Sequence, residues 1–110
     1  MQNQIVLYLL GIGVKPYYKG FNYLVSALEY TMKSMLHIPI IKIYNIVAGK
    51  YGVSPEQVER CIRTLINTLC KTMSPPAHKY KNGEFIYLCT MNLNVSCGRA
   101  YEHWNDASYY

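Results

Sequence analysis

The segment from residue 55 to residue 71, PEQVERCIRTLINTLCK, constrains the fold of this chain more than any other. Its apolar residues recur at the i, i+3, i+4, i+7 spacing of one helical face, and they are Val58, Cys61, Ile62, Leu65, Ile66, Leu69 and Cys70. Ser54 precedes the segment as a candidate cap, Pro55 suits the first helical position, and Gln57 has capping-box spacing. The sequence therefore predicts a long amphipathic helix over 55–71.

Helical periodicity also predicts the other elements of the chain. The expected helices cover residues 3–12, 20–36, about 39–50 and 83–93. Asn82 is the expected cap of the last one, although Asn-Gly at 82–83 is also a signal for a hairpin turn. The predicted fold class is all-α: a compact five- to six-helix domain over residues 1–96, followed by a C-terminal tail over 97–110.

Residues 40–71 meet the requirements of a helix-turn-helix, in which two helices pack at a steep angle across a tight turn. Ala48 is small enough for a close helix crossing, and Gly52 can adopt the positive φ that the turn needs. Apolar residues have the spacing that closes the corner, and they are Val47, Tyr51, Val53, Val58 and Cys61. The predicted arrangement is of the winged-helix or response-regulator-effector kind, with 55–71 as its recognition helix.

The polar face of this helix has side chains that can read DNA in the major groove. Arg pairs with guanine, Gln and Asn with adenine, and a carboxylate with cytosine. The candidate base-reading residues are Gln57, Glu59, Arg60, Arg63 and Thr64, and the candidate phosphate contacts are Lys42, Lys50, Ser54, Glu56, Asn67 and Lys71. Glu59 has the alternative role of holding Arg63 at i+4, and the whole face has the alternative interpretation of an ordinary solvated surface.

The charge distribution favours a polyanionic partner. The chain has a formal net charge of +5. Residues 1–82 contain ten of the eleven Lys and Arg against three acids, whereas residues 83–110 contain one Arg against three acids. A basic body of this kind is typical of nucleic-acid-binding domains, so the predicted partner is double-stranded DNA.

Nothing in the sequence predicts export or membrane insertion. The apolar stretch 5–14 is about half as long as the ~20 residues that a membrane span needs. It also has no basic leader and no small-residue cleavage site. We therefore expect a cytoplasmic protein, associated with the bacterial nucleoid, with reduced thiols and no membrane partner.

The cysteines and histidines do not form a recognisable metal or catalytic pattern. The candidate ligands lack zinc-finger spacing. These residues are Cys61, Cys70, Cys89, Cys97, His37, His78 and His103. We therefore expect no enzyme, no metal, no cofactor and no small-molecule substrate. A small cysteine or zinc enzyme is the alternative, which bound metal or a reactive thiol would indicate.

Three segments, in this order, resemble the C-terminal effector domain of stage 0 sporulation protein A, the response regulator that initiates endospore formation. They are GVKPYYKGFNYL at 13–24, VERCIR at 58–63 and NGEFIYL at 82–88. The resemblance covers about residues 3–93. It implies an all-helical domain that binds the DNA major groove, often as tandem copies, and regulates transcription. The recognition-helix Glu, Arg and Arg of that family correspond to Glu59, Arg60 and Arg63.

The chain also departs from that family. Gln57 stands where the family has Arg, and Thr64 where it has His, which implies a different target preference. The stretch over 71–83 is shorter, and no receiver domain accompanies the helices, so we expect a fragment or a free-standing relative without the phosphorylation switch. A protein-interaction module that modulates a full-length paralogue without binding DNA is therefore the alternative function. RNA polymerase and a second copy of the chain, in tandem or as a homodimer, are further candidate partners.

Overall fold

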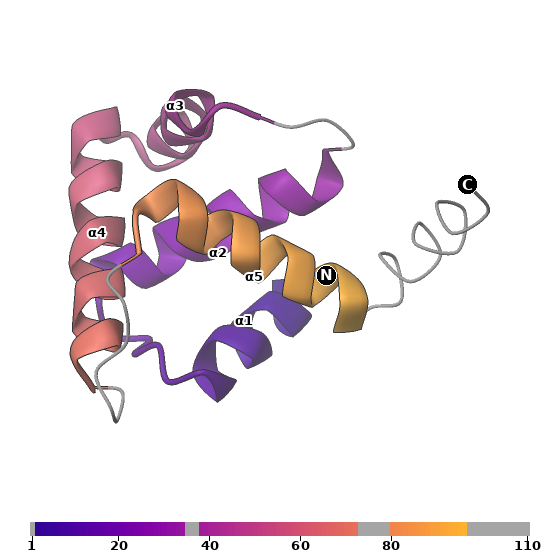
Figure 1. The fold of residues 1–110 in the computed structure, drawn as a ribbon. Coiled ribbons are helices and arrows are strands. Elements are labelled where there is room, and N and C mark those ends of the chain that lie inside the picture. The colour runs from indigo at the N-terminus through magenta and orange to yellow at the C-terminus, as the bar shows by residue number, and fades with distance from the viewer. Residues whose placement is uncertain (1, 35–37, 73–79, 97–110) are drawn as a thin grey trace.

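Five helices make up the described part of the chain, and no strand occurs there. The computed structural model describes residues 2–34, 38–72 and 80–96. The helices are α1 (Gln2–Gly11), α2 (Lys19–Lys33), α3 (Ile40–Tyr51), α4 (Pro55–Thr72) and α5 (Asn82–Ser96) (Figure 1). The predicted all-α fold class is confirmed, whereas the proposed tail over 97–110 lies outside the described residues.

The helices lie where the periodicity predicted them, with small differences at their ends. α2 ends at Lys33, and the Ser34 N–H donates to the carbonyl oxygens of Tyr30 and Thr31 at 3.2 and 3.3 Å. Residues 35 and 36, which were predicted to continue this helix, lie outside the described residues. α5 continues to Ser96 rather than ending at residue 93.

The prediction that Asn82 caps α5 is wrong, because Asn82 is the first residue of the helix. The cap position belongs to Lys81, whose backbone N–H donates to the Glu84 carboxylate Oε1 at 3.0 Å. The Phe85 N–H donates to the Lys81 carbonyl oxygen at 3.0 Å, which closes the first turn. Asn82 and Gly83 are helical, so the hairpin alternative is excluded.

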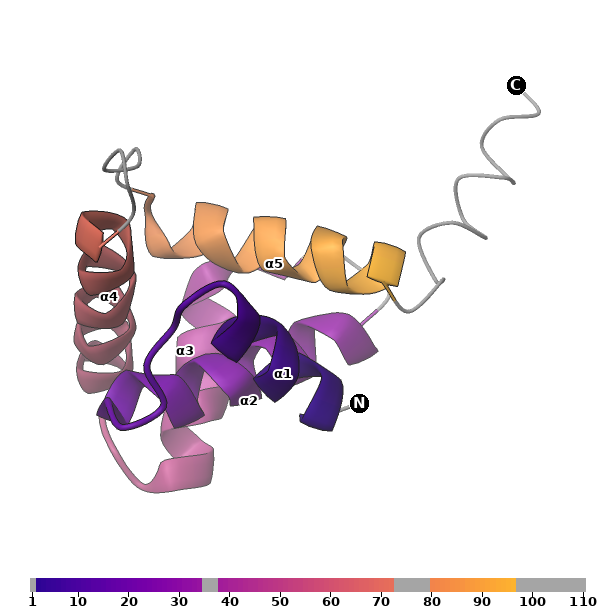
Figure 2. The ribbon, with the colours of Figure 1, turned by 90° about the horizontal axis from the view of Figure 1, so that it is seen from below.

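The α2 helix lies at the centre of the molecule and packs against each of the other four helices (Figures 1 and 2). Large side chains from all five helices are fully buried in one core, among them Ile5, Leu24, Leu28, Val47, Ile62, Leu65 and Leu93. Burying each such side chain contributes about 1.5–3 kcal/mol. The core therefore holds α4 by its apolar face at one side of the molecule and leaves its polar face toward solvent.

The α2 and α4 helices approach each other closely at Gly20. A Cβ atom at this position would fall against the carbonyl oxygen of Cys61, 2.8 Å from its carbonyl carbon and 3.3 Å from the Ile62 nitrogen. These are backbone atoms of α4, so a side chain at residue 20 would push the two helices apart. Gly20 thus supports α4 from the side opposite its polar face.

None of the helices in the described ranges combines the length and the apolar character that crossing a bilayer requires.

Candidate nucleic-acid interface

The turn between α3 and α4 has the predicted geometry. Gly52 has φ 67° and ψ 34°, in the left-handed region that glycine adopts without strain. The Val53 N–H donates to the Ala48 carbonyl oxygen at 3.1 Å, and the Gly52 N–H is directed to the same oxygen. Ala48 itself is buried, at 3% exposure. The chain therefore reverses tightly after α3 and enters α4 within three residues.

The start of α4 is capped as predicted. The Ser54 hydroxyl oxygen accepts from the Gln57 backbone N–H at 3.1 Å, and the Ser54 carbonyl oxygen accepts from the Val58 N–H at 3.2 Å. A serine in this role satisfies one of the backbone donors that the first turn of a helix leaves unpaired. The first turn of α4 is thus fixed beside the turn.

The end of α3 is tied to α2. The Tyr51 and Ser26 hydroxyl groups are 2.8 Å apart, and the Tyr51 ring packs edge-on against Tyr23, with 5.1 Å between the ring centroids. The Lys50 ammonium donates to the Ser26 hydroxyl at 3.1 Å. Tyr51 therefore secures α3 on α2. Lys50, predicted as a phosphate contact, has its ammonium beside α2 while the residue as a whole stays exposed.

The polar face of α4 is open to solvent among the described residues. α4 stands at the side of the molecule, with its buried residues turned toward α2 and α3 (Figure 1). Of the candidate base-reading residues, Arg60, Arg63 and Thr64 are exposed, and Gln57 and Glu59 are half-buried. Of the candidate phosphate contacts, Asn67 is half-buried, and Lys42, Lys50, Ser54, Glu56 and Lys71 are exposed.

The exposed residues of α4 form a stripe opposite its buried face. Glu56, Arg60, Thr64 and Lys71 recur at the helical spacing that keeps side chains in line, and none of them is near the apolar positions Val58, Ile62 and Leu65. Arg63 lies on the flank of this stripe. The α4 face therefore presents one arginine directly outward and a second one at its side.

Arg63 is oriented by Glu59. The Arg63 Nη1 and the Glu59 Oε1 are 3.0 Å apart, and the two side chains are 55% and 33% exposed. An exposed ion pair of this kind contributes about 0–1 kcal/mol to stability, so its main effect is on side-chain orientation. The alternative role predicted for Glu59, holding Arg63 at i+4, is thus present in the structure.

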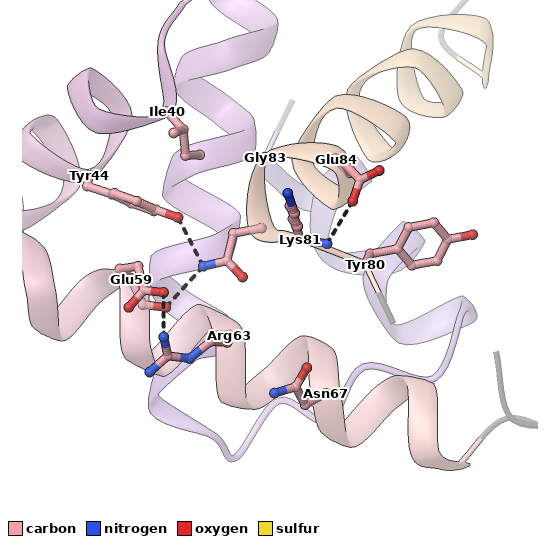
Figure 3. Close-up of a pocket in the computed structure, with 10 residues that line it drawn as sticks. Ile40, Tyr44, Glu59, Arg63, Asn67, Tyr80, Lys81, Gly83 and Glu84 are labelled. Carbon is pink, nitrogen blue, oxygen red and sulfur yellow. Dashed lines mark hydrogen bonds and ion pairs between the residues drawn. The ribbon is translucent and has the colours of Figure 1, made fainter. Parts of the chain in front are cut away.

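A groove of about 550 Å³ separates the Arg63 flank of α4 from the start of α5 (Figure 3). Glu59, Arg63 and Asn67 line one wall, and the other walls come from Ile40, Tyr44, Tyr80, Lys81, Asn82, Gly83 and Glu84. Burial raises the pKa of Tyr44, and the nearby Glu59 carboxylate adds to this, so the Tyr44 hydroxyl keeps its proton at neutral pH.

Sequence reasoning missed the residues that this groove brings to α4. Lys81 and Asn82 lie about twenty positions beyond Arg63 in the chain, and no spacing rule connects them to α4. The sequence did indicate a role for Asn82, but the wrong one: a polar residue at a helix start predicts a cap. Only the packing of α5 against α4 shows that its side chain has another role.

The described residues do not bring cysteines and carboxylates together as a metal site would require, since no group of three or more His, Cys, Asp or Glu has suitable geometry there. All three histidines and Cys97 lie outside these ranges: His37, His78, His103 and Cys97 are not described. Burial raises the pKa of the Cys89 thiol to about 12. Cys89 is therefore protonated and weakly nucleophilic at neutral pH.

The left-handed turn at Gly52, the capped α4 and its open polar face define a helix-turn-helix domain. A family model described as "Sporulation initiation factor Spo0A C terminal" matches residues 5–93. The chain belongs to this family of DNA-binding, transcription-regulating domains of sporulation. The match confirms the resemblance seen in the sequence. No curated protein and no solved structure matches the chain significantly.

Proposed function

We propose that this domain is a sequence-specific transcription regulator that reads the major groove of double-stranded DNA with α4. The observation that carries the proposal is the position of α4. It follows a left-handed turn, is held by its apolar face, and leaves Arg60 and Arg63 exposed together. An α-helix is about 10–12 Å wide with its side chains, which matches the ~12 Å width of the major groove.

Base reading is assigned to the first turns of α4, which enter the groove deepest in helix-turn-helix domains. Arg60 projects from the middle of the exposed stripe, and Arg63 projects from its flank with Glu59 holding one end of the guanidinium. Both arginines are candidates for bidentate contact with guanine. Gln57 and Thr64 adjoin them as candidates for the neighbouring bases, and the second oxygen of Glu59 is a candidate acceptor for cytosine.

Phosphate contacts are assigned to the residues around this centre. Ser54 and Glu56 place backbone N–H groups of the α4 N-terminus at one end of the stripe, where the helix dipole favours an anion. Asn67 and Lys71 lie toward the other end. Lys42 and Lys50 belong to α3 and would contact phosphates of the DNA backbone beside the major groove. These contacts provide affinity that depends on salt but not on sequence.

Such a regulator acts by binding rather than by catalysis. DNA is its main partner, and a second copy bound in tandem or as a homodimer, together with RNA polymerase, are the proposed protein partners. Action on chromosomal DNA would place the domain in the cytoplasm, at the nucleoid.

The test begins with selection of bound duplexes from a random library, followed by measurement of Kd on the selected duplex and on a random one. Arg63→Ala should weaken binding to the selected duplex about 5- to 150-fold, the range of one bidentate base contact, and change random binding far less. Lys71→Ala is the matched control. It should weaken both duplexes alike and reduce the salt slope by about 0.9. Equal losses on both duplexes for Arg63→Ala would refute base reading by this residue.

A second candidate function is the protein-interaction module without DNA binding. Its supporting observation is a set of exposed apolar side chains on α1 and α5, Leu7, Leu10, Tyr87, Leu88 and Met91, of which Leu7 is 68% exposed. Exposed apolar groups of this kind favour a protein partner. If the selection enriched no duplex at low salt while a full-length paralogue bound the domain, this second function would replace the first.

A further inference from the structure

The side chain of Asn82 joins three helices at the edge of the groove beside Arg63. It is one of two buried polar residues in the described part of the chain, at 8% exposure. Its amide nitrogen Nδ2 donates to the Tyr44 hydroxyl oxygen of α3 and to the Glu59 carbonyl oxygen of α4, each at 3.0 Å (Figure 3). Both hydrogens of the amide nitrogen are therefore used between helices.

The acceptor on α4 belongs to Glu59, the residue whose carboxylate holds the Arg63 side chain. In an α-helix the carbonyl oxygen of Glu59 accepts the backbone N–H of Arg63, four residues later, and a carbonyl oxygen has a second lone pair for another donor. Asn82 occupies that second position. The Glu59 carboxylate then holds the Arg63 guanidinium at 3.0 Å. Asn82 thus contacts the same residue that orients the arginine.

Directional hydrogen bonds fix what apolar packing leaves adjustable. The apolar face of α4 would tolerate small shifts along or about the helix axis, because dispersion contacts have little directional preference. The two bonds from one planar amide allow much less movement between α3, α4 and the start of α5. A shift of about 1 Å in a contacting group is enough to lose a precise polar contact.

We propose that Asn82 is a positioning residue for DNA reading: its two hydrogen bonds fix the α4 backbone at Glu59, and so the point at which Arg63, which Glu59 orients, meets a base edge. This inference rests on the proposed function of α4. Asn82 is buried and bonds the backbone of Glu59, so it acts through Glu59 and Arg63 and need not contact DNA. Its loss should therefore reduce specificity and leave phosphate-driven binding largely in place.

The test is a double-mutant cycle in the full 110-residue chain, with Asn82→Asp and Arg63→Ala as the single changes. Asp has nearly the size of Asn but presents only acceptors when ionised, so it cannot donate to Tyr44 or Glu59. The measured quantity is the ratio of Kd on a random duplex to Kd on the selected duplex. Asn82→Asp should lower this ratio about tenfold, within the range of one bidentate base contact, with the salt slope on random DNA unchanged.

The cycle separates positioning from a general loss of stability. In the Arg63→Ala background, Asn82→Asp should have little further effect on the specificity ratio, because the residue through which it acts is gone. Leu93→Ala, a fully buried change in the same helix, is the stability control. It should lower the melting temperature and keep the specificity ratio. If Asn82→Asp does not fold, Asn82→Ser, which is neutral and too short to make both bonds, takes its place in the same cycle.

The two proposals fail in different ways. If the wild-type chain shows no preference for any duplex, the proposed function is wrong. If the wild-type chain discriminates and a folded Asn82 variant discriminates equally well, the positioning role is wrong and the function stands. Equal tenfold losses from the Asn82 change with and without Arg63 would also refute positioning through Arg63.

Discussion

Replacing Gly20 by alanine should damage the support of α4 from behind. The added Cβ would lie 2.8 Å from the Cys61 carbonyl carbon and closer still to its oxygen, whereas ordinary contacts begin at 3.4 Å, so the helices would have to separate by at least about 0.6 Å. A gap of this size forfeits roughly a quarter or more of each affected dispersion contact. Because the obstacle is backbone, no side chain can turn aside, and we expect a loss near the upper end of the usual overpacking range, about 3 kcal/mol.

The assay for Gly20→Ala is thermal and urea unfolding followed by circular dichroism. A loss of 3 kcal/mol should lower Tm by roughly 10–25 °C in a domain of about this size. Gly49→Ala is the matched control, since a Cβ at this helical position has no neighbour within 4 Å. The control should gain about 0.5–1 kcal/mol from helix propensity. If Gly20→Ala were as stable as Gly49→Ala, the close packing of α2 on the α4 backbone would be wrong.

Three further predictions concern the turn, the cap and a buried thiol. Gly52→Ala should cost about 1 kcal/mol, because alanine is strained at φ 67°, although the space around the new Cβ is open; urea unfolding measures this, and an unchanged midpoint would contradict the left-handed turn. Ser54→Ala should cost about 1 kcal/mol through loss of the bond to the Gln57 N–H, while Ser54→Asp should retain most of the stability. Burial raises the pKa of the Cys89 thiol from 9.0 to about 12 in the folded state, so its contribution to stability is complete below pH 9 and is lost as the pH rises toward 12. The free energy of unfolding should therefore fall less steeply between pH 9 and 12 in Cys89→Ala than in the wild-type chain. An identical pH dependence of this free energy in the two proteins would refute the raised pKa.

The sequence was sufficient for those features that depend on residues close together in the chain. The periodicity of α4, the Ser54 cap and the positive φ of Gly52 are local properties, and each has the predicted form. Helix ends were less accurate, since α2 ends at Lys33 and not at residue 36. The pattern of apolar residues alone does not determine where a helix stops, because capping by nearby backbone groups also contributes.

The contacts between distant segments could not be predicted in this way. Asn82 has the chemistry of a helix cap, yet the neighbouring Lys81 takes the cap position and Glu84 supplies the bond. The Asn82 amide is then free to bond Tyr44 and Glu59, 38 and 23 residues away. Similarly, nothing in the sequence indicates that Gly20 must accommodate the backbone at Cys61. Such partners are determined by how the helices pack, which a single sequence does not specify.

The central claim is that α4 reads base edges in the major groove, and guanine N7 is accessible only there. The most direct measurement replaces each guanine of the selected duplex in turn by 7-deazaguanine and compares Kd for the wild-type chain, Arg60→Ala and Arg63→Ala. We predict that at least one replacement weakens wild-type binding about tenfold and has no further effect on the variant that lacks the arginine reading that base. Replacements that leave wild-type binding unchanged at every guanine, or that weaken all three proteins equally, would contradict the account.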